Sequence, residues 1–172
     1  MQKKSFTLNI NSGKRNLNAV SGETIFEAFK RQDFYLPSAC SAQGKCGLCR
    51  LRILNNPTAP LEQERKFISA SDLESGYRLA CQTVVDKDLQ LELPASYYSI
   101  AEYEVKITKK EFLTADIVFI ECQAVEPKLI RLVAGCFLQW ELPVEDQNGK
   151  VCKRPFSLAS NPANQRKIEF FI

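Results

Sequence analysis

The stretch that decides the fold is Cys40-Ser41-Ala42-Gln43-Gly44-Lys45-Cys46-Gly47-Leu48-Cys49, together with a fourth cysteine, Cys81, far downstream. Five residues separate the first two cysteines of this stretch, and two residues separate the second from the third. Gly44 and Gly47 lie among them, and glycine permits tight backbone turns because it has no Cβ atom. The pattern predicts a loop that places three thiolates around one centre, with a fourth supplied by a distant segment.

Four thiolates in this arrangement are typical of a plant-type 2Fe–2S cluster, in which each of two irons takes two soft, deprotonated ligands. The predicted metal ligands are therefore Cys40, Cys46, Cys49 and Cys81. A structural zinc site is one alternative, but four-cysteine zinc sites normally use two knuckles with about two to four residues between partners, and Cys81 has no near partner. Cysteines that are simply buried are the other alternative, and three of them inside one short loop argue against it.

The remaining cysteines, Cys122, Cys136 and Cys152, lie in strand-like sequence without metal-ligand spacing, so we predict small core residues. The chain has seven cysteines and no histidine. An odd number of cysteines, without a secretory signal, argues against a disulfide framework. The absence of histidine excludes Ser-His-Asp and Cys-His catalysis within these residues. Chemistry here must depend on cysteine, a metal or a cofactor.

The composition bounds the possible partners. The 172 residues include 23 basic and 20 acidic side chains, giving a net charge of +3. This balance does not favour nucleic acid or an anionic membrane as a partner. The sequence contains no run of about 18 apolar residues, and its first residues lack the apolar stretch of a secretory signal. We therefore expect no membrane span and a cytoplasmic location.

The first half of the sequence predicts strands around one helix. Phe6, Leu8 and Ile10 alternate with polar residues, as expected for a half-buried strand. Thr24 and Glu27 fit a capping box, which places a helix start near residue 23. The other elements expected here are strands at 15–20, 49–54, 79–85 and 89–93, and a stretch of helix-forming residues at 61–68.

A boundary at 94–101 precedes a different pattern. Short strands are predicted at 103–107, 117–122, 137–142, 154–160 and 167–172, with no convincing helix among them. Asn148-Gly149 is a hairpin turn signal. Short strands at regular spacing are typical of an antiparallel barrel or sandwich. The sequence thus predicts an α+β protein with one domain at 1–95 and a second, all-β domain at 102–172.

The cysteine loop, followed by Leu79-Ala80-Cys81-Gln82, resembles the ferredoxin domain of modular NADH-dependent reductases, such as the reductase components of aromatic oxygenases. The resemblance covers about residues 5–93 and implies a β-grasp fold with the cluster loop near the surface. The usual plant-type spacing has about four residues between the first two cysteines. The five found here resemble the ferredoxin domain in the F subunit of the sodium-translocating NADH:quinone reductase.

A second resemblance lies in Arg154-Pro155-Phe156-Ser157-Leu158-Ala159-Ser160, which is similar to the flavin motif Arg-x-Tyr-Ser-x-x-Ser of the ferredoxin reductase superfamily. It implies an incomplete FAD-binding β-barrel at 102–172. Arg154 would reach the flavin pyrophosphate, Phe156 would pack against the isoalloxazine, and Ser157 would hydrogen-bond near the reactive ring nitrogen. An ordinary edge strand is the alternative. Arg131 and Trp140 are expected to be surface or core residues rather than cofactor contacts.

Together the two resemblances imply a flow of electrons from NADH to FAD, then to the 2Fe–2S cluster, then to a partner protein such as an oxygenase. The sequence contains no Gly-rich phosphate loop. We therefore expect NADH to be the donor only in a longer parent protein that carries a nicotinamide-binding domain, and we assign no catalytic residue here. The alternative is a ferredoxin-like electron carrier whose partial barrel binds no flavin.

Overall fold

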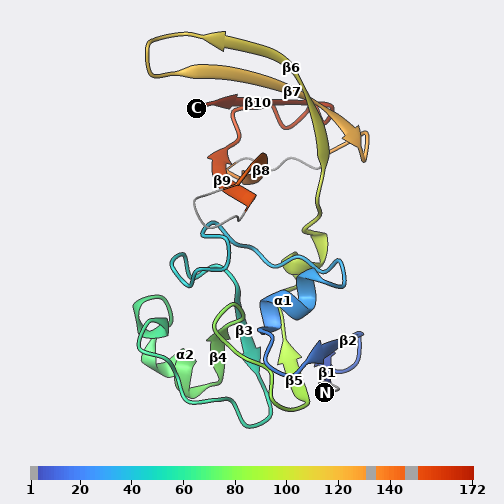
Figure 1. Cartoon of the computed structure of the whole chain (residues 1–172), viewed down its shortest axis with the longest axis vertical. Helices are drawn as coiled ribbons and strands as arrows, with labels where there is room; N and C mark the ends of the chain where they lie inside the picture. The colour runs from blue at the N-terminus through green and yellow to red at the C-terminus, as the bar shows by residue number, and fades with distance from the viewer. Residues whose placement is uncertain (1–3, 131–134, 146–150) are drawn as a thin grey trace. The chain divides into compact units, whose positions relative to one another are not determined.

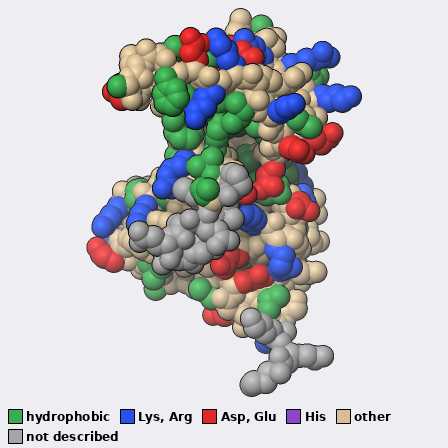
Figure 2. Space-filling view, turned by 45° about the horizontal axis from the view of Figure 1, so that its top comes forward, with side chains coloured by type: hydrophobic (Ala, Val, Ile, Leu, Met, Phe, Trp, Pro, Cys, Tyr) green, Lys and Arg blue, Asp and Glu red, His purple; other side chains and the backbone are tan. Residues whose placement is uncertain are grey.

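The computed structural model of the protein describes residues 4–130, 135–145 and 151–172. The chain divides into two compact units, Met1–Ala101 and Glu102–Ile172. Among the described residues, no helix has the length and apolar character needed to cross a membrane. Lys, Arg, Asp and Glu side chains are interspersed on the face shown in Figure 2, as the balanced composition leads one to expect.

The first unit is built on a five-stranded mixed sheet (Figure 1). Its strands, in chain order, are β1 (Ser5–Ile10), β2 (Arg15–Val20), β3 (Arg50–Ile53), β4 (Tyr77–Leu79) and β5 (Leu89–Glu92). They are arranged in the order β2-β1-β5-β3-β4. Strands β1 and β5 pair in parallel, and the other neighbouring pairs are antiparallel. This is the predicted β-grasp arrangement of a mixed sheet and one helix.

Helix α1 (Ile25–Lys30) packs against one face of this sheet (Figure 1). Its start is fixed as the sequence predicts, because the Thr24 hydroxyl accepts a hydrogen bond from the Glu27 amide and the Glu27 carboxylate accepts one from the Thr24 amide. The side chains between helix and sheet are fully buried and form the core of the unit; they include Leu8, Ile10, Ile25, Phe29, Leu51, Ile53 and Leu91.

Two predicted elements of this unit are wrong. Residues 61–68 hold only the single 3-10 turn η1 (Glu64–Lys66), and the short helix α2 (Ala70–Glu74) comes after it instead. The strand predicted at 79–85 ends at Leu79, because the amides of Gln82 and Thr83 fold back to the Leu79 carbonyl. This turn directs Cys81 toward the cysteine loop, so tertiary contacts override the strand propensity of the valines after it. A second 3-10 helix, η2 (Ala95–Ser99), ends the unit.

In its described residues, 102–130, 135–145 and 151–172, the second unit contains strands and no helix: β6 (Glu104–Phe112), β7 (Val118–Glu126), β8 (Phe137–Glu145), β9 (Val151–Ser157) and β10 (Lys167–Phe171). They form a three-stranded sheet, β10-β7-β6, and a two-stranded sheet, β8-β9, with every pairing antiparallel. This arrangement is a portion of an antiparallel β-barrel. Several strands are longer than predicted, since paired strands continue beyond the alternating stretches. Its core is formed by Ile120, Cys122, Ala124, Ile130, Ile168 and Phe170.

The three cysteines predicted as core residues, Cys122, Cys136 and Cys152, do not all lie in the core. Cys122 is fully buried on β7, as predicted. Cys136 is exposed, so that prediction is wrong; it precedes β8, and its carbonyl accepts a hydrogen bond from the Leu158 amide while its side chain faces outward. The side chain of Cys152, the residue Arg131 and the predicted turn at Asn148-Gly149 lie outside the described residues. Trp140 is half-buried against the core, as expected.

Candidate functional site

The structure brings the four predicted ligand cysteines together as two pairs. The thiols of Cys40 and Cys46 lie within hydrogen-bonding reach of each other, and so do those of Cys49 and Cys81. Cys49 immediately precedes β3, and Cys81 lies in the turn after β4, which is the neighbour of β3 in the sheet. The adjacency of these strands is what brings the distant fourth cysteine to the loop.

The loop backbone adopts several left-handed conformations. Ser41 and Ala42 have φ values of 52° and 64°, and Gly44 and Gly47 have values of 71° and 70°. Two consecutive non-glycine residues in this region are uncommon, because the Cβ atom crowds the backbone there. The Ala42 amide donates to the Ser38 hydroxyl at 3.2 Å, and this side chain helps to hold the left-handed turn.

The loop supplies hydrogen-bond donors to its own sulfurs. Burial alone would raise the pKa of Cys40, but donors at the Lys45 amide (3.4 Å from Sγ), the Cys46 thiol and nearby amides lower it below its usual value. A hydrogen bond from Cys49 lowers the pKa of Cys81 to about 6, against the effect of burial, with help from the Gln82 side chain and the Gly44 amide. The same Cys81 contact, with burial, raises the pKa of Cys49. The donors at Cys40 and Cys81 favour the thiolate form that a metal requires.

The donor set fits a two-iron group. A 2Fe–2S cluster needs two thiolates on each iron, and the loop offers two thiol pairs whose sulfurs accept hydrogen bonds from backbone amides. Within the part of the chain that the structure describes, no three Cys, Asp or Glu side chains converge on one point as ligands of a single ion would. The paired arrangement is the observation that carries the fit.

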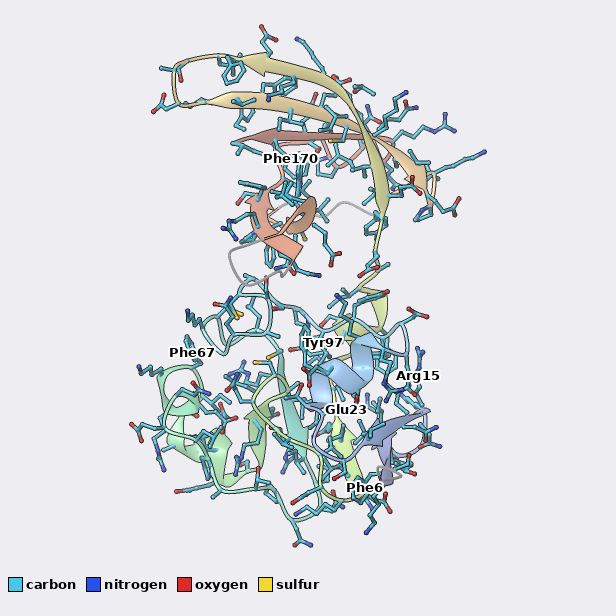
Figure 3. The ribbon with its side chains drawn as sticks, viewed as in Figure 1. Phe6, Arg15, Glu23, Phe67, Tyr97 and Phe170 are labelled. Carbon is cyan, nitrogen blue, oxygen red and sulfur yellow. The ribbon has the colours of Figure 1, made fainter. Side chains whose placement is uncertain are left out.

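Phe67 supports the loop from outside. Its side chain, labelled in Figure 3, packs against Gly47 so closely that a Cβ atom at position 47 would lie 2.7 Å from the Phe67 Cβ atom. On the other flank, the Tyr97 hydroxyl lies 2.8 Å from the Leu48 carbonyl and 2.9 Å from the Arg50 carbonyl. These two aromatic residues fix the segment that carries Cys49.

We expect Gly47→Ala to destabilise the protein by about 3 kcal/mol, since it adds left-handed strain and overpacking against Phe67. The urea midpoint of unfolding, followed by far-UV circular dichroism, measures this loss. Gly22→Ala is the matched control, because Gly22 also has a positive φ, 92°, but a Cβ atom there would meet nothing within 4 Å. Gly22→Ala therefore measures the cost of the left-handed backbone alone, about 1–2 kcal/mol of stability. Equal losses in the two variants would show that the contact with Phe67 contributes nothing.

Two buried charged side chains, Glu64 and Arg78, lie at the end of β4. Glu64, only 1% exposed, accepts hydrogen bonds from the Leu79 amide at 2.7 Å and the Leu61 amide at 2.9 Å. Arg78, 3% exposed, donates to the carbonyls of Thr58, Leu73 and Tyr77. Burial lowers the pKa of Arg78, and attraction to Glu64 opposes that shift. The carboxylate therefore ties η1 to the end of β4, two residues before Cys81.

The predicted flavin residues lie on β9 in the second unit. Arg154 is exposed and Phe156 is half-buried; they occupy alternate positions of the strand and so share one face. Phe156 packs edge-to-face on Trp140, with ring centroids 5.8 Å apart. Ser157 is exposed and falls on the opposite face. The strand thus brings Arg154 and Phe156 together but directs Ser157 elsewhere.

Residues 8–86 match the protein family described as the 2Fe-2S iron-sulfur cluster binding domain. These residues include all four cysteines of the loop and turn. The first unit is a 2Fe–2S ferredoxin domain.

The residues that the sequence pattern does not single out within it are Phe67, Gln82, Glu64 and Tyr97. Only the position of Gln82 beside Cys81 could have drawn attention, because the others come close to the loop through folding alone.

The ferredoxin domain and the strands after it also have relatives among longer reductases. The chain is 30% identical over 123 residues to the F subunit of the Na(+)-translocating NADH-quinone reductase of Chlamydia muridarum, an alignment that covers 72% of this chain and 28% of that protein. It is 25% identical over 144 residues to the corresponding protein of a Marinomonas species, covering 84% of this chain and 35% of the relative. The chain therefore spans about a third or less of the length of these relatives.

Two solved structures share the fold. The Amycolatopsis cytochrome P450 reductase GcoB superposes with a TM-score of 0.59 at 22% identity, covering 97% of this chain and 48% of that one. The ferredoxin reductase in carbazole 1,9a-dioxygenase superposes with a TM-score of 0.51 at 19% identity, covering 100% and 50%. The chain is thus ferredoxin-reductase-like in fold, with a ferredoxin domain followed by a portion of a β-barrel.

Proposed function

We propose that this chain is the electron-transfer part of an NADH:acceptor oxidoreductase, in which electrons pass from NADH to FAD, to the 2Fe–2S cluster and then to a partner protein such as an oxygenase. The observation that carries the proposal is the pairing of Cys40 with Cys46 and of Cys49 with Cys81 inside a ferredoxin domain. The similarity to NADH-quinone reductase subunits supports the NADH-dependent class. A cytoplasmic location is proposed from the sequence alone.

The proposed ligands are Cys40 and Cys46 on one iron and Cys49 and Cys81 on the other. The cluster, when bound, supplies one-electron transfer at low potential, about −400 mV for plant-type ferredoxins. The protein's own residues hold the thiolates and surround them with amide donors, notably those of Lys45 and Gly44. Cys40 and Cys46 are only partly buried, so this side of the site is open to a partner. The proposal therefore places electron exit at the loop surface.

The proposed flavin site uses Arg154 for the pyrophosphate, Phe156 for the isoalloxazine and Ser157 for a hydrogen bond near the ring nitrogen. A guanidinium suits phosphate because it is planar and always charged, and an aromatic ring suits a flat heterocycle. FAD, when bound, would convert the two-electron donor NADH into one-electron steps. The exposure of Arg154 and its place on the same face as Phe156 support these two assignments. Ser157 lies on the opposite face of β9, so its position does not support its assignment.

The test is an anaerobic purification in which iron, acid-labile sulfide and released flavin are quantified on one sample. About two irons, two sulfides and one FAD per chain are expected if the proposal holds. Iron and sulfide without flavin would favour the second candidate, a ferredoxin-like one-electron carrier that binds no flavin. The observation that favours this candidate is that the second unit forms only a portion of a barrel. One metal per chain without sulfide would contradict both candidates.

We expect Arg154→Ala to weaken FAD binding about ten- to a hundredfold, because a hydrogen bond to a charged group contributes about 1.5–3 kcal/mol. Quenching of flavin fluorescence on titration with protein gives the affinity. Arg166→Ala is the control, since Arg166 is also exposed in the same unit but lies outside the motif. The iron content should be unchanged in both variants. Equal FAD affinity in Arg154→Ala and the parent would refute the flavin motif.

A further inference from the structure

The side chain of Gln82 lies between a ligand sulfur and a second amide. Its Nε2 atom donates to the Cys81 Sγ atom at 3.4 Å, within the range of hydrogen bonds to sulfur. Its Oε1 atom accepts a hydrogen bond from the Nε2 atom of Gln63, which comes from the segment just before η1. Because Gln63 occupies the oxygen end, the nitrogen end of the Gln82 carboxamide is directed at the sulfur.

Packing holds this carboxamide in place. Gln82 is half-buried, and its own backbone amide is fixed by a hydrogen bond to the Leu79 carbonyl at 2.9 Å. Gly44 of the cysteine loop approaches so closely that a Cβ atom there would lie 2.7 Å from Nε2 of Gln82 and 2.9 Å from its carboxamide carbon. The side chain is therefore enclosed by the loop on one side and oriented by Gln63 on the other.

Cys81 thereby receives donors of two kinds, the backbone amide of Gly44 and the side-chain amide of Gln82. A hydrogen-bond donor at a ligand sulfur stabilises negative charge on that sulfur. Reduction of the cluster adds one negative charge, so such a donor stabilises the reduced form more than the oxidised form and raises the reduction potential. The Gly44 amide belongs to the backbone, whereas the Gln82 amide can be removed by substitution.

We infer that Gln82, oriented by Gln63, is a positioning residue that sets the reduction potential of the cluster through its hydrogen bond to Cys81. The inference rests on the proposed function, because it requires Cys81 to be a cluster ligand. It goes beyond that function by assigning the tuning of the potential to a side-chain pair outside the ligand set. A residue with only a structural role would change cluster content or stability without changing the potential.

The test is an anaerobic redox titration, followed by visible absorption and electron paramagnetic resonance, of the parent and three variants. Gln82→Leu should shift the midpoint potential to a more negative value. Gln63→Ala should produce a smaller shift of the same sign, because the Gln82 amide remains but loses its orientation. Gln43→Ala is the control: Gln43 is an exposed glutamine of the cysteine loop, and the substitution keeps its backbone amide. It should titrate like the parent.

Iron and sulfide are measured first on every sample, so that the two hypotheses can fail separately. A parent without iron and sulfide would remove the proposed function and this inference with it. A parent with the cluster, and a Gln82→Leu variant that holds the same iron at an unchanged potential, would overturn the inference alone. If Gln82→Leu does not assemble a cluster, Gln63→Ala decides: a more negative potential supports the inference, and the parent value overturns it.

Discussion

The Cys46→Ser variant is expected to lose nearly all of its bound iron, from about two irons per chain in the parent. An alkoxide is a harder and much more basic ligand than a thiolate, so serine does not replace cysteine well on iron. Cys46 is only half-buried and lies outside the buried core of the sheet, so the β-grasp fold should persist. Iron analysis and the visible charge-transfer bands of the cluster measure the loss directly.

The same variant should loosen the loop without unfolding the sheet. Within residues 38–54, amide hydrogen exchange is expected to accelerate most in the loop before β3, whereas β1 and β5 stay protected. Cys136→Ser is the matched control, because Cys136 is an exposed cysteine of the second unit and is not a predicted ligand. It should keep the parent's iron and spectrum. Full iron retention with an unchanged spectrum in Cys46→Ser would remove Cys46 from the ligand set.

Glu64→Ala is expected to destabilise the ferredoxin domain by about 2–4 kcal/mol, because backbone amides that it satisfies are left without an acceptor. The buried amide of Leu79 and the part-buried amide of Leu61 lose their acceptor, and Arg78 loses the attraction of the Glu64 carboxylate. The urea midpoint of unfolding reports the change. Because Leu79 lies two residues before Cys81, the variant should also purify with less iron.

Glu62→Ala provides the comparison for Glu64→Ala. The Glu62 side chain is 90% exposed and pairs with Arg65 at 3.5 Å on the surface, so its loss should change stability by less than about 1 kcal/mol. Glu64→Gln should fall between the two, since the amide keeps one acceptor oxygen. A stability of Glu64→Ala within the error of Glu62→Ala would mean that the buried carboxylate does not hold η1 to β4.

Local patterns in the sequence predicted most of the first unit. The alternation of Phe6, Leu8 and Ile10 and the capping box at Thr24 depend on near neighbours in the chain, and both are confirmed. The helix-forming residues at 61–68 make only the 3-10 turn η1, because the Glu64 carboxylate is held on the Leu61 and Leu79 amides and tertiary contacts override helix propensity. In the second unit, strand existence was predictable from β-propensity, whereas strand length depended on the partner strand.

The sequence predicted more about the cysteine site of the first unit than about the flavin motif of the second. The spacing of the cysteines indicated a cluster, and the structure brings all four together in pairs; the ligand set itself stays a prediction. For the flavin motif, Arg154 and Phe156 share a face and Ser157 does not, which the alternation of a strand implies once its extent is known. Cys136 was predicted wrongly because a cysteine in strand-like sequence can face either side.

The sequence by itself indicated the chemistry: four cysteines at these spacings offer the soft thiolate ligands that an iron–sulfur cluster requires. Only the tertiary structure decided what surrounds them. Glu64 is one of two glutamates in an ordinary polar stretch, and folding buries it while leaving Glu62 in solvent. Gln63 reaches Gln82, and Gln82 reaches Cys81, because β4 ends in a turn beside the loop. Ligand identity is a property of residue type, whereas hydrogen bonds to the ligands depend on contacts between segments distant in the chain.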